Sequence, residues 1–170
     1  MDRREFFRRL SGRKRAMRPP ASLPERDFFE HCNSCGDCVS ACPQQIVKIS
    51  AHSLPVIDLA HAGCTFCGDC RMACQHGAFD QTVNIEQSWN WRPQIADSCL
   101  DKIGIVCRAC EGSCDTRAIS FRPALGGRHD VSVSMADCNG CGVCVSACHT
   151  GAISMGLHQS SFQTPKEAVA

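Results

Sequence analysis

Sixteen of the 170 residues are cysteines, and they are gathered in four short segments of the chain. Three segments share one spacing, in which two residues separate the first three cysteines and three residues precede the last. Thiolates this crowded form a natural ligand set for a soft metal centre. The regular runs are Cys32, Cys35, Cys38 and Cys42; Cys64, Cys67, Cys70 and Cys74; and Cys138, Cys141, Cys144 and Cys148.

The spacing of these runs is typical of the bacterial ferredoxin motif that holds a [4Fe–4S] cluster by four thiolates. Its first three cysteines lie on a loop around one cluster, and its last ligates the other cluster in two-cluster proteins. Zinc sites usually pair two separated Cys-x2-Cys knuckles, and crowded cysteines suit disulfides poorly. The runs therefore predict three [4Fe–4S] clusters. Glycines give each loop room to turn, at Gly36, Gly68, Gly140 and Gly142.

The fourth segment departs from this spacing at its beginning. Cys107, Cys110 and Cys114 match the last three positions of a run, but seven residues instead of two separate Cys99 from Cys107. A cluster needs four thiolates in space and no fixed spacing, so residues 100–106 are interpreted as a run with a loop inserted. The even number of cysteines favours a fourth cluster. The alternative is a set of free thiols or a vestigial half-site.

Each cysteine segment runs into a turn and a short apolar stretch, so the chain is read as four copies of one unit. We expect an α+β fold of tandem bacterial-type two-cluster ferredoxin modules, small, with short helices and β-hairpins. Each module is too small for a conventional apolar core, so the clusters are expected to serve as one. The expected divisions are a basic arm at 1–27, a first module at 28–80, a join at 81–98, a second module at 99–157 and a tail at 158–170.

Two hairpins are expected between the paired cysteine segments. Residues 46–49 and 54–59 predict one, and residues 118–121 and 131–135 predict the other across a glycine-rich turn. The join contains the only tryptophans, Trp89 and Trp91, whose alternation predicts one strand face packed on a module. A partner-docking patch is the alternative interpretation of these tryptophans.

The basic charge is concentrated at the N-terminus. Residues 1–18 hold eight of the eighteen Lys and Arg residues and only two acidic ones. Such arms usually contact acidic surfaces. On helical spacing the arm would be amphipathic, and the alternative is a solvated tail. Its candidate partner-binding residues are Arg3, Arg4, Phe6, Phe7, Arg8 and Arg9.

The sequence offers no catalytic set beside the cysteines. It has no paired carboxylates, Ser-His-Asp arrangement or phosphate-binding loop, and its histidines are scattered. The chain is therefore expected to move electrons or to hold iron and sulfur, and not to be an enzyme. No apolar stretch is long enough to span a membrane or to act as a secretory signal, so a cytoplasmic location is expected.

The order and flanks of the cysteine groups resemble the NapF family, the ferredoxin-type accessory proteins of periplasmic nitrate reductase systems. The residues that carry the resemblance are the stretched third group Cys99…Cys107-Arg108-Ala109-Cys110, the preceding Arg18-Pro19-Pro20 and the following Phe121-Arg122-Pro123. Gln75 and His149 stand where ferredoxins usually place proline, which leaves the ligands intact and the reduction potentials open.

The resemblance implies a protein that contacts NapA, the molybdenum-containing catalytic subunit, in the cytoplasm before its export. It would help that subunit mature by supplying or reducing the subunit's own [4Fe–4S] cluster. An anionic membrane surface is a second partner to consider for the basic arm, and no nucleic-acid partner is expected. Two other functions stay open: an electron-transfer subunit between redox partners, and a scaffold or adaptor whose clusters are structural.

Overall fold

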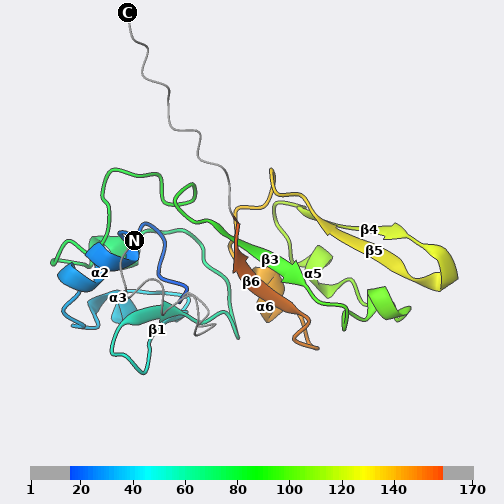
Figure 1. The fold of residues 1–170 in the computed structure, drawn as a ribbon, viewed down its shortest axis with the longest axis horizontal. Coiled ribbons are helices and arrows are strands. Elements are labelled where there is room, and N and C mark those ends of the chain that lie inside the picture. Colours follow the sequence, from blue (N-terminus) through cyan, green and yellow to red (C-terminus); the bar gives the residue numbers. More distant parts are fainter. Residues whose placement is uncertain (1–15, 159–170) are drawn as a thin grey trace, which may run out of the picture.

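The structure is a computed structural model that describes residues 16–158. Two similar halves follow one another along its long axis, and a long hairpin projects from the second (Figure 1). We call residues 16–80 the first half and residues 91–158 the second half. The arm residues singled out above, Arg3 to Arg9, lie outside the described residues. No helix within 16–158 has both the length and the apolar character required to cross a bilayer.

Each cysteine segment forms a single helical turn directly after its loop. The first half contains α3 (Asp37–Ser40) and α4 (Asp69–Met72), and the second contains α5 (Ala109–Gly112) and α6 (Val143–Ser146). A residue with left-handed backbone precedes each turn, because the chain must reverse there to bring the next cysteine inward. Three of these residues are glycines, as predicted, and the fourth is Arg108.

Both predicted hairpins are confirmed. In the first half, β1 (Val47–Ile49) pairs antiparallel with β2 (Pro55–Ile57), and Val47 lies opposite Ile57. In the second half, β4 (Ile119–Pro123) pairs with β5 (His129–Val133). This hairpin is longer than expected, since one-to-one pairing continues until the 3-10 turn η2 (Leu125–Gly127) reverses the chain.

A closing strand pair in each half was not anticipated from the sequence. In the second half, β3 (Trp91–Ile95) pairs antiparallel with β6 (Ile153–Leu157), so residues assigned to the join complete this half. The first half repeats the arrangement with one bridge between Ser22 and Phe79. We therefore propose that the modules begin earlier than their cysteines indicate, near residues 16 and 91.

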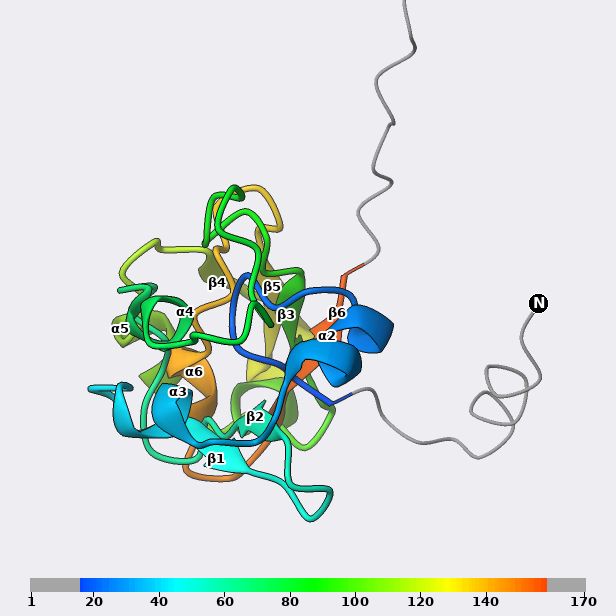
Figure 2. The same ribbon diagram turned by 90° about the vertical axis from the view of Figure 1, so that its left-hand side faces the viewer.

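The segment before the first cysteine is thus part of the body, although its sequence places it in the basic arm. The chain loops back before it enters α2 (Glu25–His31), which leads to Cys32 (Figure 2). The Arg18 guanidinium donates to Pro55 O at 2.7 Å and pairs with the Glu25 carboxylate at 2.8 Å. Both partners of this pair are largely buried, so Arg18 fastens the segment to the hairpin and the helix.

The cores of the two halves differ in size. The core of the first half is built around Phe28, whose ring meets that of Phe79 edge-on at 6.0 Å. The core of the second half consists of Cys110, Ile119, Cys144 and Ile153. Cysteines belong to both cores, as expected for modules that use their clusters as core.

The halves contact each other closely along their cysteine loops. The Cys64 amide donates to the Cys141 carbonyl at 2.7 Å. Gly63 and Gly142 make this approach feasible, because a side chain at Gly63 would collide with Val143 and one at Gly142 with Leu59. The two halves are therefore joined at one ligand loop of each.

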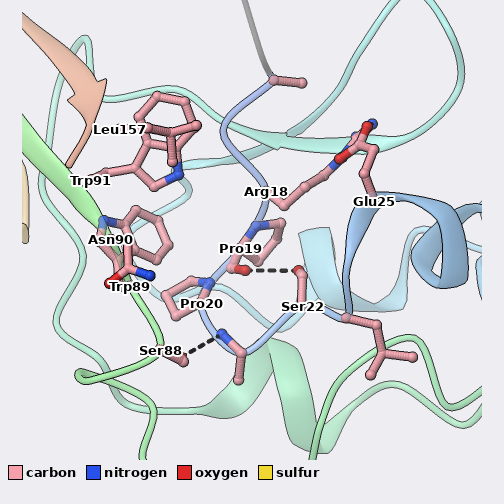
Figure 3. Close-up of a pocket in the computed structure, with 13 residues that line it drawn as sticks. Arg18, Pro19, Pro20, Ser22, Glu25, Ser88, Trp89, Asn90, Trp91 and Leu157 are labelled. Carbon is pink, nitrogen blue, oxygen red and sulfur yellow. Dashed lines mark hydrogen bonds and ion pairs between the residues drawn. The ribbon is translucent and has the colours of Figure 1, made fainter. Parts of the chain in front are cut away.

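Both tryptophans lie near this junction. Trp89 is buried before β3 begins, and its ring meets that of Phe66 edge-on at 6.0 Å. The predicted packing on a module is therefore confirmed for Trp89. Trp91 is only partly buried, and both line a pocket against the segment from Ala16 to Glu25 (Figure 3). The Ser88 hydroxyl, which lines this pocket, accepts a hydrogen bond from the Ala21 amide at 3.0 Å. This bond ties the chain before β3 to the first half.

Candidate iron–sulfur cluster sites

The cysteines of the first half gather into two sets, each combining three cysteines of one run with the last cysteine of the other. Cys38 lies close enough to Cys32, Cys35 and Cys74 for their charges to raise its pKa. The charges of Cys64, Cys42, Cys67 and Cys38 raise the pKa of Cys70 in the same way. Cys38 is the third cysteine of the other run, so the ferredoxin pattern, in which only the last cysteine crosses over, assigns it to the neighbouring group. We call these groups set 1 (Cys32, Cys35, Cys38 and Cys74) and set 2 (Cys64, Cys67, Cys70 and Cys42).

The second half repeats this exchange. Cys144 has Cys141, Cys138, Cys110 and Cys114 as charged neighbours, and Cys110 has Cys99 and Cys148. Cys110 is the third cysteine of its own run and by the same pattern belongs to the other group. Cys107 joins Cys110 through its place in the same run, three residues earlier. Set 3 is therefore Cys99, Cys107, Cys110 and Cys148, and set 4 is Cys138, Cys141, Cys144 and Cys114.

The cysteine within each helical turn, the third of its run, is buried, and its pKa is raised. Burial, reinforced by neighbouring thiols, raises the pKa of Cys38 and Cys110 to about 11 and that of Cys70 and Cys144 to about 12. An iron ligand must be a thiolate, so filling these sets releases protons. Once the iron is bound, the apolar surroundings keep water away from the sulfurs.

Two cysteines of the second half depart from this trend. Burial alone would raise the pKa of Cys114 and Cys148, but hydrogen bonds to their sulfurs lower it overall. The Ala118 amide donates to Cys114 Sγ at 3.3 Å, and the Ala152 amide donates to Cys148 Sγ at 3.3 Å. The hydroxyls of Thr116 and Thr150 lie 3.5 and 3.6 Å from the same sulfurs. Hydrogen bonds to ligand sulfurs are a principal means of tuning a cluster's potential.

Sequence reasoning passed over both threonines. They form a Cys-x-Thr pattern that occurs only after the last cysteine of the second-half runs, where the first half has Gln44 and His76. That pattern was a usable signal. Asp101 was also passed over, although from within the inserted residues its carboxylate accepts a hydrogen bond from the Cys107 amide.

The sets differ in how far they reach the surface. The second cysteine of the run is exposed in sets 1, 2 and 3, at Cys35, Cys67 and Cys107. Its counterpart in set 4, Cys141, is partly covered because its carbonyl accepts the hydrogen bond from the first half. Three sets therefore present an edge to solvent, and set 4 faces the junction.

The donor sets fit a [4Fe–4S] cluster in chemistry and surroundings. Each consists of four cysteine thiols, and in each the third cysteine of a run is buried. In residues 16–158 no three His, Cys, Asp or Glu side chains lie close enough together to bind a single ion. A zinc ion would hold its sulfurs about 2.3 Å from one point, whereas a cluster spaces its cysteines around its own volume.

Comparison with known protein families places the motifs in context. The family model for a 4Fe-4S dicluster domain matches the chain twice, over residues 31–78 and 105–152. The matches support [4Fe–4S] clusters and the tandem arrangement. Cys99 precedes the second matched segment, so the first cysteine of set 3 lies outside the family match.

Several characterised bacterial proteins are similar over most of the chain. The ferredoxin-type protein NapF of Escherichia coli is 35% identical over 148 residues, which cover 85% of this chain and 89% of that protein. NapF of Haemophilus influenzae is 36% identical over 139 residues, covering 82% and 78%. The methylamine utilization ferredoxin-type protein MauM of Paracoccus denitrificans is 33% identical over 157 residues, covering 81% and 68%.

Proposed function

Because the chain belongs to the NapF family of ferredoxin-type proteins, we propose that it assists maturation of the molybdenum catalytic subunit of periplasmic nitrate reductase, NapA. Its general role is that of an iron–sulfur accessory or electron-transfer protein. It acts on the subunit in the cytoplasm before export, either by supplying iron and sulfide or by reducing the subunit's cluster. Sets 1 to 4 hold one [4Fe–4S] cluster each, and the chain catalyses no bond-making itself.

One observation supports this function above the others: three of the four sets reach the surface through an exposed cysteine. A protein that hands over electrons, or iron and sulfide, must let its partner approach the group that it carries. The bound clusters supply one-electron redox chemistry. The chain holds them by thiolates, buries one ligand of each on a helical turn, and leaves Cys35, Cys67 and Cys107 at the surface.

Delivery and reduction are separated by following the iron. The chain is loaded with 55Fe and incubated anaerobically with two preparations of the catalytic subunit, one that lacks its cluster and one that holds it oxidised. Radioactivity found on the subunit after separation supports delivery. Radioactivity that stays on the chain, while a cluster already on the subunit becomes reduced, supports reduction. If neither iron transfer nor cluster reduction occurs in the presence of dithionite, the maturation role is contradicted.

The runner-up function, relaying electrons between redox partners, is favoured by the junction of the halves. The Cys64 amide donates to the Cys141 carbonyl, so ligand loops of sets 2 and 4 are in direct contact. A relay needs this contact, whereas delivery from a surface set does not. Gly63→Ala would push Val143 away and slow electron passage between the halves without changing their iron content. Unchanged transfer rates would count against the relay.

The basic arm is proposed to dock on the partner. Arg3, Arg4, Phe6, Phe7, Arg8 and Arg9 carry this proposal by their sequence alone, since residues 1–15 lie outside the described structure. Deleting residues 2–15 should weaken capture of the catalytic subunit in a pulldown, and vesicles with anionic lipid test the membrane alternative. Deleting residues 159–170 is the matched control. Equal capture by both deletions would contradict docking through the arm.

A further inference from the structure

The inserted residues of the third run fold into a compact turn. The 3-10 turn η1 (Asp101–Ile103) follows Cys99 almost directly and ends at Gly104, whose φ is +91°. The Ile105 amide then donates back to the Leu100 carbonyl at 2.8 Å. The turn is therefore closed by its own backbone, and the chain continues from it to Cys107.

Two of the regular runs fix their second cysteine by a side chain. The Asn33 carboxamide oxygen accepts the Cys35 amide at 3.1 Å, and the Asn139 oxygen accepts the Cys141 amide at the same distance. In both cases the acceptor stands two residues before the cysteine that it holds. The corresponding position of the third run is Ile105, which has no side-chain acceptor.

Asp101 supplies the missing acceptor from within the inserted turn. Its Oδ2 accepts the Cys107 amide at 2.9 Å and the Arg108 amide at 3.0 Å. One side-chain oxygen thus holds two consecutive amides of the cysteine loop, whereas each asparagine oxygen holds the amide of its cysteine. The insertion that displaces the usual acceptor thus brings its own replacement.

The second of these bonds stabilises an unusual backbone position. Arg108 occupies the left-handed region at φ +53°, where the other runs have Gly36, Gly68 and Gly142. Left-handed backbone is unfavourable for a residue with a side chain. Its guanidinium also lies 5.5 Å from the centre of the Phe121 ring on β4. The turn into α5 is therefore held through the backbone amide of Arg108 and through its side chain.

The carboxylate of Asp101 is built into the second half and is not a surface feature. At 1% exposure, Asp101 is the single buried charged residue in the described chain. His129 Nδ1, on the hairpin strand β5, lies 3.1 Å from its second oxygen, Oδ1. A buried polar group is costly unless it is partnered, and both partners of Oδ2 are amides of the cysteine loop. The Asp101 side chain is therefore committed to this loop.

We propose that Asp101 is the positioning residue of set 3, which fixes Cys107 and the turn after it so that the inserted run offers a complete ligand set. The proposal rests on the proposed function in one respect, since that function assigns a cluster to set 3. It adds the residue that gives the irregular run the side-chain acceptor found in two of the regular ones.

The test is Asp101→Ala in the full chain, reconstituted anaerobically beside the unaltered protein. We expect about sixteen irons in the unaltered protein and about twelve in the variant, since each cluster holds four. Where set 3 still fills, its iron should be lost to a chelator about 10- to 100-fold faster, the usual effect of losing an outer partner. Electron paramagnetic resonance of the reduced protein should lose or alter one cluster's signal only.

Asp97→Ala is the matched control, because Asp97 is a fully exposed aspartate near the same turn that pairs only with Lys102. Asp101→Asn keeps an acceptor and should retain more iron than the alanine variant. Adding Arg108→Gly should partly restore the iron content of Asp101→Ala, because glycine adopts the left-handed backbone without strain. Rescue by glycine is not expected if Asp101 serves only the stability of the body.

Two outcomes would overturn the proposal, and they are distinct. If Asp101→Ala matches Asp97→Ala in iron content, spectrum and chelator kinetics, Asp101 does not position Cys107, and the cluster assignment stands. If the unaltered protein holds only about twelve irons, set 3 is empty and the assignment itself fails. Should the alanine variant not accumulate, Asp101→Leu, which fills the buried position but offers no acceptor, decides by the same comparison with Asp97→Ala.

Discussion

The two halves are copies of one unit, yet the first has a larger apolar core than the second. Phe28 and Phe79 fill the first half together with the side chains of its short hairpin. The second half relies on Ile119 and Ile153 around two buried cysteines, and its long hairpin projects away from the body. Stability in the first half therefore comes from both side chains and clusters, and in the second half mainly from clusters.

Removing the iron should have the largest effect and should separate the halves most clearly. A chelator should unfold the second half completely, because metal binding is coupled to folding in such sites, and leave some protection around Phe28. Circular dichroism follows the loss of structure, and hydrogen exchange assigns it to each half. Native secondary structure without iron, or an equal loss of hydrogen-exchange protection in both halves, would contradict this difference between the halves.

Truncating the aromatic core should affect the first half alone. Phe28→Ala should lower the free energy of opening there by about 3–5 kcal/mol, the usual cost of removing a buried Phe side chain. Protection of β4 and β5 should not change. Phe29→Ala is the control, since Phe29 is 52% exposed and follows directly in α2. Hydrogen exchange of the iron-loaded protein measures the free energy of opening in both variants. Equal losses would show that burying Phe28 does not stabilise the first half.

The threonines should distinguish the second half by reduction potential. Thr116→Val and Thr150→Val each remove the hydroxyl that lies beside the sulfur of Cys114 or Cys148. The lost hydrogen bond favours the more negative, reduced cluster. The potentials of the second-half clusters should therefore fall. The shift is on the order of 40 mV if a bond of about 1 kcal/mol is lost. Redox titration measures it against Ser113→Ala, which removes a hydroxyl bonded to the Cys110 carbonyl and not to a sulfur.

The pH dependence of cluster assembly should show the smallest difference. Cys38, Cys70, Cys110 and Cys144 have a pKa of about 11 to 12, well above neutral pH. Their thiolate fraction rises about tenfold per pH unit below the pKa. Reconstitution should therefore accelerate from pH 7 to pH 9 and release protons. The lowered pKa of Cys114 and Cys148 should make this rise shallower in the second half. A pH-independent rate would contradict the role of buried thiols.

Much of the fold was accessible to sequence reasoning because its signals are local. The hairpins appeared as short apolar stretches beside turns, and three of the four left-handed positions as glycines. The pairing of β3 with β6 was not accessible, since Trp91 and Leu157 are brought together only when the second half closes. Arg108 was missed for another reason: an arginine gives no sign of a left-handed position that a distant carboxylate supports.

The amino-acid sequence alone is enough to predict thiolate ligands, because three closely spaced cysteines can converge on one centre and the fourth can reach a neighbouring one. The folded chain was needed to see which sets reach solvent, how Cys64 meets Cys141 across the junction, and how Asp101 supplies the acceptor that Ile105 cannot. These features depend on burial and on contacts between separate segments, and a pattern along the chain contains neither.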